Sequence, residues 1–459
     1  MKKKHTRPFY EKLIDNHQLP EFDQFIDQLR DNSDYWISGL TGSSKALFTA
    51  HIFQRTARPM LLIENTIDTA ENMVDDLTTF LGPDRVIYFP DWEITPYEGR
   101  SPHESALGAR LDAMHRMLCN DNCIWVATVQ SLARRIPEPA FLLDATIYLK
   151  KGKRYNLETL IQRFVEIGFR REKKVEDVNS FAIRGDILDF FTYTHQNPVR
   201  VEFWDDHIDD IRLFDVYNQR SIEPINELAI LPAGELFLLP DHIESGLQGI
   251  TKRKREFEQD QRQYRRAAFE DKKDFELEEE ADRMLDMVDG DPDRVIDKLR
   301  ENISFEGQEE YFPFFIPKLT TLIDYLPKSA YILFDERSDV IESGNRFWKK
   351  IQQQYIKSGA MRRPMPRPEI VFVNPDSLIQ QCKDRIRIDM TWMHLRPPVE
   401  NVSYHQRMEI KGQDSVGGHL NQASDMLREL VRGGYHITIF ADNRGQMERL
   451  KSMLEDVPY

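Results

Sequence analysis

This sequence has few cysteines, no apolar run long enough to span a membrane and no excess of basic residues. Three cysteines occur among 459 residues and none forms a CxxC pair, which argues against a disulfide framework and favours a reducing compartment, the cytoplasm. No apolar run approaches the ~20 residues of a membrane span. No apolar segment follows the basic start MKKKHTRPFYEKLID, so a secretory signal is not expected. A net charge of −15 disfavours nucleic acid as the main partner of the chain.

Apolar stretches and helical patterns alternate between residues 35 and 136. Continuous apolar runs separated by helices are typical of a parallel, doubly wound sheet. The spacing predicts strands at 35–40, 59–64, 85–90 and 123–128, and helices at 45–55, 66–81 and 101–118. Ser101 is expected to cap the last helix, because Pro102 and Glu104 follow it at positions typical of a helix start.

The pattern changes near residue 145. One helix and several stretches of alternating polar and apolar residues predict a small antiparallel α+β unit at 145–234. Helix and strand patterns of the first kind resume at 235–393, so we expect this unit to be inserted into a domain that starts in 1–144. Residues 394–459 hold a proline-bearing linker and the start of a third α/β domain, with too few elements to bury a core alone. We therefore expect the chain to be part of a larger protein.

Two segments have less distinctive patterns. The highly charged stretch 250–288 is expected to be one long solvated helix with a packed edge. The alternative, a basic patch that binds phosphates, is disfavoured by the acidic residues interleaved in it. Past the linker, helices are expected at 419–432 and 444–454, with a strand at 436–441 between them.

Residues 39–46, GLTGSSKA, nearly match the phosphate-binding template G-x-x-x-x-G-K-S/T. Gly39 and Lys45 are in place, but Ser44 replaces the second glycine and Ala46 replaces the hydroxyl that helps to hold Mg²⁺. Tight binding and hydrolysis of Mg-ATP are therefore expected to be lost. The loop amides and the helix dipole still allow an anion site at this degenerate loop. Its residues are Gly39, Gly42, Ser43, Ser44 and Lys45.

An acidic pair follows a later apolar strand. Asp335 and Glu336, in LFDERSD, stand where the acidic residues of a Walker B motif would lie. Acidic residues after a strand are common, so we interpret this pair as a degenerate Walker B element. No catalytic residue and no metal site are expected in this chain.

Several stretches together resemble the bacterial transcription-repair coupling factors (Mfd). GLTGSSKA, YFPDWEITPYEGRSPHESALGARLDAMHRM and VATVQSLARRIP resemble the N-terminal region of that family. GFRREKKVEDVNSFAIRGDILDFF and VRVEFWDDHIDDIRLFD match a domain that the family shares with the excision-repair protein UvrB. The resemblance covers roughly 30–390, and 404–459 looks like the opening of the family's third domain. It implies a degenerate RecA/P-loop-like parallel-sheet domain with an inserted α+β domain, followed by the start of another α/β domain.

The resemblance also implies a function. The full-length proteins recognise RNA polymerase stalled at a lesion, displace it with an ATP-driven translocase on double-stranded DNA, and attract the damage sensor UvrA. The polymerase-binding and translocase parts, with their ATP and Mg²⁺, would lie outside this chain, so no cofactor is expected here. UvrB also grips damaged DNA with an aromatic-rich hairpin, whereas only a few residues separate Tyr97 from Ser101 here and leave no room for one. What survives is the UvrA-binding part.

Three residues are candidates for the UvrA interface by resemblance to the family: Arg170, Arg184 and Phe190. If FAIRGDILDFF is a single strand, Arg184, Asp186 and Phe190 share one of its faces. An exposed arginine beside aromatic surface is a typical interface anchor. The alternatives are that Arg184 forms an ion pair with Asp186 or Asp189, and that Phe190 lies in the core.

Other conspicuous side chains have structural interpretations. The acidic run 205–210 is expected to be a solvated hairpin turn rather than a metal site, because neighbouring carboxylates repel one another. Trp92 is expected to be a buried anchor rather than a base-stacking residue. His103 and His115 have no nearby nucleophile that would make a catalytic triad.

Two hypotheses for the function follow. The first is a catalytically silent adaptor that binds UvrA through the inserted domain, and it contacts no membrane. The alternative is a nucleotide-dependent DNA-binding enzyme of the UvrB or helicase class, which Gly39, Lys45, Asp335 and Glu336 favour.

Overall fold

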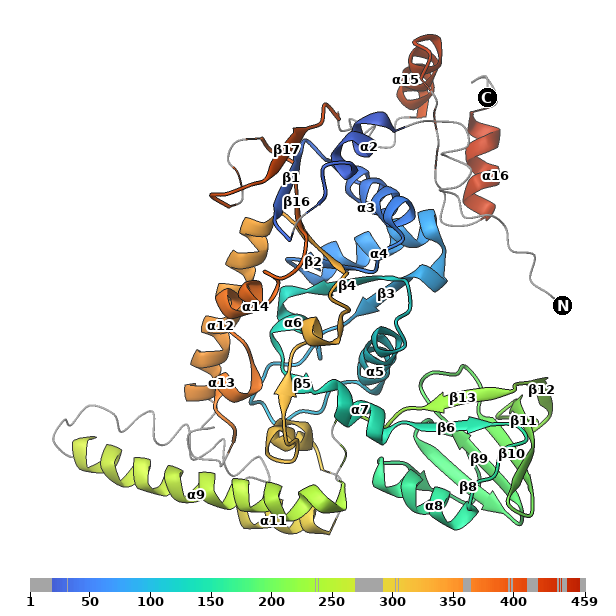
Figure 1. Cartoon of the computed structure of the whole chain (residues 1–459), viewed down its shortest axis with the longest axis vertical. Helices are drawn as coiled ribbons and strands as arrows, with labels where there is room; N and C mark the ends of the chain where they lie inside the picture. Colours follow the sequence, from blue (N-terminus) through green and yellow to red (C-terminus); the bar gives the residue numbers. More distant parts are fainter. Residues whose placement is uncertain are drawn as a thin grey trace. The chain divides into compact units, whose positions relative to one another are not determined.

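The computed structural model describes residues 19–454 except 31, 236, 238, 269–291, 302, 304, 358–364, 395, 396, 398, 411–419, 436, 438 and 440–443. The chain divides into two units, Met1–Glu409 and Ile410–Tyr459. The ribbon diagram of the whole chain is given in Figure 1. No helix in the described ranges is long and apolar enough to cross a membrane.

A seven-stranded, fully parallel sheet forms the centre of the first unit. Its strand order is β17-β1-β16-β15-β2-β4-β3. The strands are β1 (Asp34–Ser38), β2 (Met60–Glu64), β3 (Val86–Phe89), β4 (Ile124–Thr128), β15 (Tyr331–Asp335), β16 (Arg387–Thr391) and β17 (Tyr404–Arg407). Because β15 and β16 pair between β1 and β2, segments on both sides of the insertion build one sheet. The prediction of a RecA-like parallel-sheet domain is confirmed.

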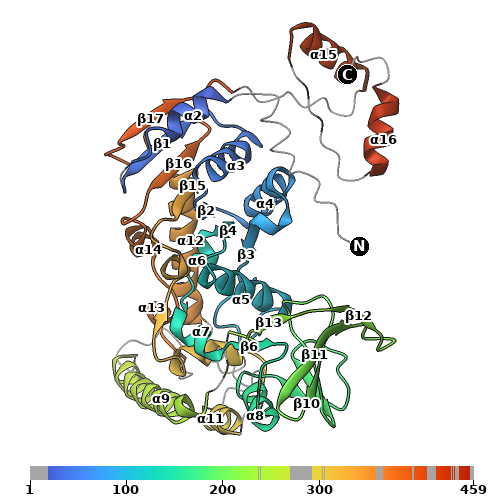
Figure 2. The same ribbon diagram turned by 45° about the vertical axis from the view of Figure 1, so that its right-hand side comes forward.

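Helices cover both faces of this sheet. Figures 1 and 2 place α3, α4 and α5 on one face and α6, α12 and α14 on the other. Thr66 and Thr69 form a capping box at the start of α4. The bounds of the helices are α2 (Pro20–Ile26), α3 (Ser44–Thr56), α4 (Ile67–Leu81), α5 (Glu104–Leu118), α6 (Val129–Ala133), α7 (Pro139–Ala145), α9 (Pro240–Ala268), α11 (Pro292–Arg300), α12 (Arg337–Lys357), α13 (Pro368–Val371) and α14 (Pro375–Gln381). Shorter elements are η1 (Pro83–Arg85), β5 (Ile136–Pro137), η2 (Gln308–Phe314), β14 (Leu319–Thr320) and η3 (Leu322–Tyr325).

The predicted start of α5 is wrong by three residues. The helix begins at Glu104 with His103 as its cap, and the His103 ring accepts a hydrogen bond from the amide of Ser105. Ser101 does not cap the helix, because its hydroxyl donates to the Glu309 carboxylate at 2.6 Å. A contact between residues far apart in sequence therefore overrides a local helix-start signal.

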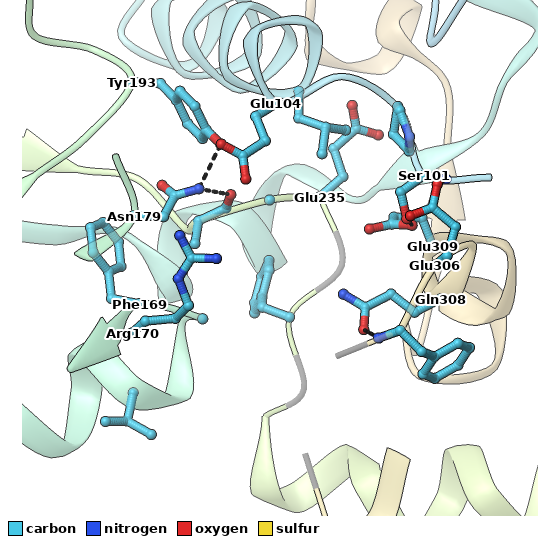
Figure 3. A pocket seen from close by; sticks show the side chains of 18 of the residues that line it. Ser101, Glu104, Phe169, Arg170, Asn179, Tyr193, Glu235, Glu306, Gln308 and Glu309 are labelled. Carbon is cyan, nitrogen blue, oxygen red and sulfur yellow. Dashed lines mark hydrogen bonds between the residues drawn. The ribbon is translucent and has the colours of Figure 1, made fainter. Parts of the chain in front are cut away.

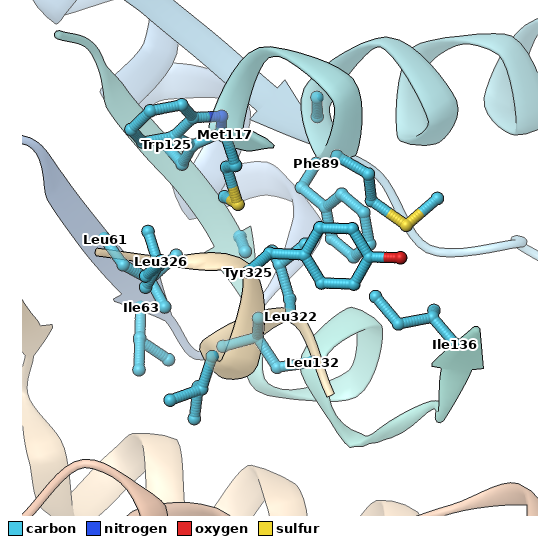
Figure 4. Packing of buried hydrophobic residues seen from close by; sticks show 14 of the residues in the cluster. Leu61, Ile63, Phe89, Met117, Trp125, Leu132, Ile136, Leu322, Tyr325 and Leu326 are labelled. Atoms are coloured by element: carbon cyan, nitrogen blue, oxygen red, sulfur yellow. The ribbon is translucent and has the colours of Figure 1, made fainter. Parts of the chain in front are cut away.

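The core on one side of the sheet joins strands to the segments that return after the insertion. Figure 4 shows Trp125 of β4 and Met117 of α5 close to Leu326 and Tyr325. The Tyr325 hydroxyl donates to the Pro137 carbonyl oxygen at 2.8 Å, so its buried polar group is satisfied. This packing ties the two parts of the interrupted domain together.

Residues 147–230 form the inserted α+β unit. β6 (Ile147–Lys150) pairs antiparallel with β13 (Glu227–Ile230), so the chain enters and leaves side by side. Between them lie helix α8 (Leu157–Glu166) and a six-stranded sheet of order β12-β11-β10-β9-β8-β7. Its strands are β7 (Arg170–Arg171), β8 (Ser180–Arg184), β9 (Ile187–Phe191), β10 (Val199–Trp204), β11 (His207–Phe214) and β12 (Ser221–Pro224). The prediction of an inserted α+β domain is confirmed.

The stretch FAIRGDILDFF is a hairpin, so its prediction as a single strand is wrong. β8 and β9 pair antiparallel, and Arg184 lies opposite Ile187 across the turn Gly185–Asp186. Gly185 has a φ of +61°, a conformation that glycine adopts without steric penalty at the first central position of a two-residue hairpin turn. The alternation of side chains between the two faces of the sheet therefore does not continue through the turn, and Arg184 shares a face with Ile187.

The charged segment and the C-terminal elements are partly described. α9 confirms the first part of the predicted charged helix, and residues 269–288 lie outside the described residues. In the second unit, α15 (Leu420–Arg432) and α16 (Arg444–Met453) agree with the two predicted helices. Most of the predicted strand 436–441 lies outside the described residues. β17, at 404–407, pairs with β1 as an edge strand of the first unit, while the domain boundaries inferred from the sequence stay predictions.

The end of the insertion is fixed to α5 by a buried ion pair. Arg110 is fully buried, its guanidinium contacts the Glu235 carboxylate, and its Nη1 donates to the Pro90 carbonyl oxygen at 2.9 Å. We expect Glu235→Ala to lower the free energy of unfolding by about 3–5 kcal/mol, because it leaves a buried charge without its partner. Chemical denaturation followed by tryptophan fluorescence measures this loss.

Glu227→Ala is the matched control. Glu227 pairs with Lys150, but both side chains are more than half exposed, so the stability is expected to change little. Equal losses in the two variants would contradict the role given to the buried pair.

Candidate functional site

The degenerate phosphate-binding loop lies between β1 and α3, at the carboxyl edge of the parallel sheet. Gly39 has a φ of +83°, and a Cβ there would lie 2.1 Å from the Met408 carbonyl oxygen, so the position requires glycine. The Ser44 hydroxyl accepts a hydrogen bond from the Thr41 amide at 2.8 Å and donates to the Thr41 carbonyl oxygen at 2.7 Å. Amides of such a loop normally point at phosphate oxygens. The Ser44 hydroxyl thus engages the Thr41 amide, and this donor is not available to a phosphate oxygen.

Lys45 of this loop is held by two carboxylates of the protein. Its Nζ forms ion pairs with Asp335, at the end of β15, and with Glu336, at 2.9 Å. The lysine side chain is only 12% exposed. Although burial opposes the charged form, the Asp335 and Glu336 carboxylates raise the pKa of Lys45. The lysine therefore stays charged, and that charge is already neutralised by the protein.

Glu336 is fixed in an uncommon backbone conformation. Its φ is +53°, a region that residues with a Cβ seldom adopt. Its carboxylate also accepts a hydrogen bond from the Trp392 amide at 2.6 Å. Contacts with Lys45 and Trp392 thus offset the backbone strain and hold the acidic pair against the loop.

Glu64, at the end of β2, adds a third acidic side chain. It is 1% exposed, and its Oε1 has no hydrogen-bond partner in the described part of the chain. Burial, together with the nearby Asp335 carboxylate, raises the pKa of Glu64 to about 8. Glu64 therefore keeps its proton at neutral pH.

This arrangement leaves the loop poorly suited to a nucleotide. The lysine that would reach terminal phosphates is engaged by Asp335 and Glu336, and Ala46 offers no ligand to Mg²⁺. Within the described ranges, no group of three or more His, Cys, Asp or Glu side chains could hold a metal ion. An anion site at 42–45 stays a prediction, as does the absence of a cofactor.

Phe190 does not lie on the surface of the inserted domain. It is fully buried, and its ring centroid lies 5.1 Å from that of Phe164 of α8. Phe181 of β8 also packs against Phe164. The interpretation of Phe190 as an interface residue is therefore corrected to the alternative, a core position. The reason is the hairpin turn, which directs Leu188 and Phe190 toward the core that α8 covers.

Arg184 is exposed beside this turn. Its Nη2 donates to the Lys173 carbonyl oxygen at 3.2 Å, and it forms no ion pair with any described residue. The expected alternative partner, Asp189, instead makes a bidentate ion pair with Arg200, at 2.7 and 2.8 Å. The Arg184 guanidinium thus faces solvent without a carboxylate, as an interface role requires, although that role stays a prediction.

Arg170 lies apart from Arg184. It stands on β7 opposite Ser180, whereas Arg184 is at the other end of β8. Four residues of a strand span ~13 Å. Figure 3 shows Arg170 among residues that line a cavity of about 500 Å³, where Asn179, Tyr193 and Glu104 are its neighbours. The structure therefore does not bring the two arginines together.

The charged face of the sheet that carries Arg184 was not predicted from the sequence. Arg212 forms ion pairs with Glu202 and Asp210, and Arg200 forms one with Asp189. The signal was present in VRVEFW, because Val199, Val201 and Phe203 are buried and the residues that alternate with them are not.

The structural interpretation of Trp92 agrees with the structure, whereas the run 205–210 is only partly a turn, because residues 207–210 belong to β11. Asp205 and Asp206 form the turn between β10 and β11, and Trp92 is 1% exposed. The expectation that no nucleophile lies near His115 is wrong, because 3.6 Å separate its Nε2 from the Cys119 sulfur. Burial raises the pKa of the Cys119 thiol, which disfavours a nucleophilic role.

The raised pKa of Glu64 makes a prediction about pH. Above its ordinary pKa of 4.5 the unfolded chain has released this proton while the folded protein retains it until about pH 8. The stability contributed by Glu64 therefore falls as the pH rises from 4.5 to 8, with a limiting slope of about 1.4 kcal/mol per pH unit. Glu64→Gln should remove this slope, as melting temperatures between pH 5 and 9 will show.

Glu71→Gln, at an exposed position of α4, is the control and should melt in parallel with the wild type. If Glu64→Gln also follows the wild-type profile, Glu64 is already ionised at neutral pH and the assignment is wrong.

The sequence of this chain is similar to those of several known proteins. Residues 147–236 match the family model described as the UvrB interaction domain. The chain is 23% identical over 449 residues to the transcription-repair-coupling factor of Bacillus subtilis, covering 95% of this chain and 35% of that protein. It is 28% identical over 372 residues to that of Haemophilus influenzae (80% and 29% covered) and 25% over 387 residues to that of Escherichia coli (84% and 31%).

The chain spans about a third of the length of these curated relatives. The resemblance inferred from the sequence is confirmed by the matches along nearly the whole chain. The chain is therefore similar to the transcription-repair-coupling factors, and its residues 147–236 resemble the UvrB interaction domain.

Proposed function

We propose that this chain is the adaptor module of a transcription-repair coupling factor and recruits UvrA to RNA polymerase stalled at a DNA lesion. One observation carries the proposal: the domain matched by the UvrB interaction model exposes Arg184 with no carboxylate partner among the described residues. An unpaired guanidinium on a folded sheet is well suited to bind a carboxylate of a second protein. Recruitment of UvrA would start nucleotide excision repair in the cytoplasm.

The same proposal makes the parallel-sheet domain catalytically silent. Engagement of Lys45 by Asp335 and Glu336 supports this, together with the internal hydrogen bonds of Ser44. ATP and Mg²⁺ would serve the translocase of the full-length protein. That part would also contact double-stranded DNA, and RNA polymerase would bind at a further site outside this chain.

A nucleotide-dependent DNA-binding enzyme of the UvrB or helicase class is the second candidate. It is favoured by the retention of Gly39 and Lys45 at the loop and of Asp335 and Glu336 opposite it. The two candidates differ in whether Lys45 exchanges its carboxylate partners for a phosphate.

Charge reversal at Arg184 tests the adaptor. Arg184→Glu should weaken binding of the purified chain to UvrA by at least about tenfold in calorimetry, because a favourable contact becomes a repulsive one. The melting temperature should stay unchanged, since the side chain is exposed. Arg346→Glu, a reversal at another exposed arginine, on α12, should bind like the wild type. If wild-type chain and UvrA form no complex, the adaptor function is wrong.

Thermal unfolding with Mg-ATP separates the two candidates. A nucleotide present at about a hundred times its Kd adds about 2.7 kcal/mol of stability. We expect the melting temperature to be the same with and without about 1 mM Mg-ATP. This concentration is about a hundred times a Kd of about 10 μM, so binding of that strength would be detected. A saturable rise that disappears in Lys45→Ala, accompanied by hydrolysis, would instead establish the enzyme.

A further inference from the structure

The face of the inserted sheet that α8 does not cover carries an exposed tryptophan. Phe164 of α8 packs against Phe181 and Phe190, which identifies the covered face. We call the opposite face of β8–β11 the outer face. Trp204 lies there, after the buried Phe203, and is 79% exposed. Tryptophan is seldom this exposed unless it serves a contact, because its side chain is among the largest apolar groups.

Trp204 lies at the same end of the sheet as Arg184. Ile187, the strand partner of Arg184, is also the partner of Glu202 on β10. Beyond that pair, the Phe203 amide donates to the Asp186 carbonyl oxygen at 2.9 Å. The turn that follows Arg184 and the turn that follows Trp204 are therefore neighbours.

The other charges of the outer face are held in place by ion pairs. Arg200 is paired with Asp189, and Arg212 with Glu202 and Asp210. Charges fixed in this way form a rigid rim that needs little reorganisation when a partner binds. Arg184 and Trp204 are two groups at this end that remain available for binding, since Arg184 has no ion pair with a described residue and Trp204 is 79% exposed.

We propose that Trp204 is the aromatic anchor of the interface that includes Arg184. The inference rests on the proposed function. The partner is a protein surface with an apolar pocket that takes the indole and a carboxylate that pairs with Arg184. Tryptophan and arginine are among the residue types that most often dominate binding energy at protein interfaces.

The charges around Trp204 favour a protein over a nucleic acid. Asp205 and Asp206 follow it directly, and Asp206 lies near the half-exposed His207. Single-stranded nucleic acids bind where aromatic rings lie in basic grooves. Here Asp205 and Asp206 follow the ring directly, and the nearby arginines Arg154, Arg200 and Arg212 are each paired with a carboxylate, so the ring does not lie in a basic groove.

Substitution of Trp204 tests the anchor with UvrA as the probe. Trp204→Ala should weaken binding of the whole chain to UvrA by ten- to a hundredfold in calorimetry, and Trp204→Phe should restore part of the affinity. The melting temperature should not change, because the indole packs against little of the protein. Tyr217→Ala is the matched control: Tyr217 is 94% exposed but lies past the other end of β11, so its loss should leave the affinity unchanged.

The outcomes distinguish this inference from the proposed function. Weakening by both Trp204→Ala and Arg184→Glu, with Tyr217→Ala unchanged, supports the anchor. Weakening by Arg184→Glu alone overturns the anchor and leaves the adaptor function standing. Equal weakening by Trp204→Ala and Tyr217→Ala also overturns the anchor. So does a result in which Trp204→Ala lowers the affinity for single-stranded DNA and leaves the affinity for UvrA unchanged. Absence of any wild-type complex overturns both.

Discussion

The ion pairs of Lys45 with Asp335 and Glu336 are the constraint on which this account depends. In an active phosphate-binding loop the lysine meets the terminal phosphates of the nucleotide. Here two carboxylates of the protein supply the negative charge instead, and Ser44 binds an amide of the loop. The carboxyl edge of the sheet is thereby stabilised from within, and no ligand is needed to complete its charge balance. Under the proposed function, this scaffold is therefore stable without a bound nucleotide.

Under the proposed function, the inserted domain carries the binding role. Its polypeptide leaves and rejoins the main domain through the paired strands β6 and β13, and the buried pair of Arg110 with Glu235 secures the return. The inserted domain also packs against the main domain, because its hydrophobic core includes Phe141, Phe312 and Ile316. Its outer face combines fixed charges with Arg184 and Trp204, so binding groups are placed on rigid strands rather than on loose loops.

Local patterns in the sequence predicted most of the helices and strands. Contacts between residues far apart in the sequence determine the side-chain partners and the exact helix start, which local patterns did not predict. The parallel strands and the insertion were predictable because apolar spacing and its change near residue 145 are local signals. The β8–β9 hairpin was missed although Gly185–Asp186 is a dipeptide typical of two-residue hairpin turns, and this error misplaced Phe190. Lys45 and Asp335 were both recognised, but 290 residues separate them, so their direct contact was not predictable. Ser101 was misassigned for the same reason, since its partner Glu309 is 208 positions away.

A crystal structure of the chain grown with a non-hydrolysable ATP analogue and Mg²⁺ tests the central claim most directly. The account predicts that Lys45 Nζ remains in contact with Asp335 and Glu336 and that no nucleotide density lies over residues 39–45. Density for a triphosphate in contact with Lys45, with Mg²⁺ beside Asp335, would contradict it. Such a result would return the parallel-sheet domain to the nucleotide-binding enzymes.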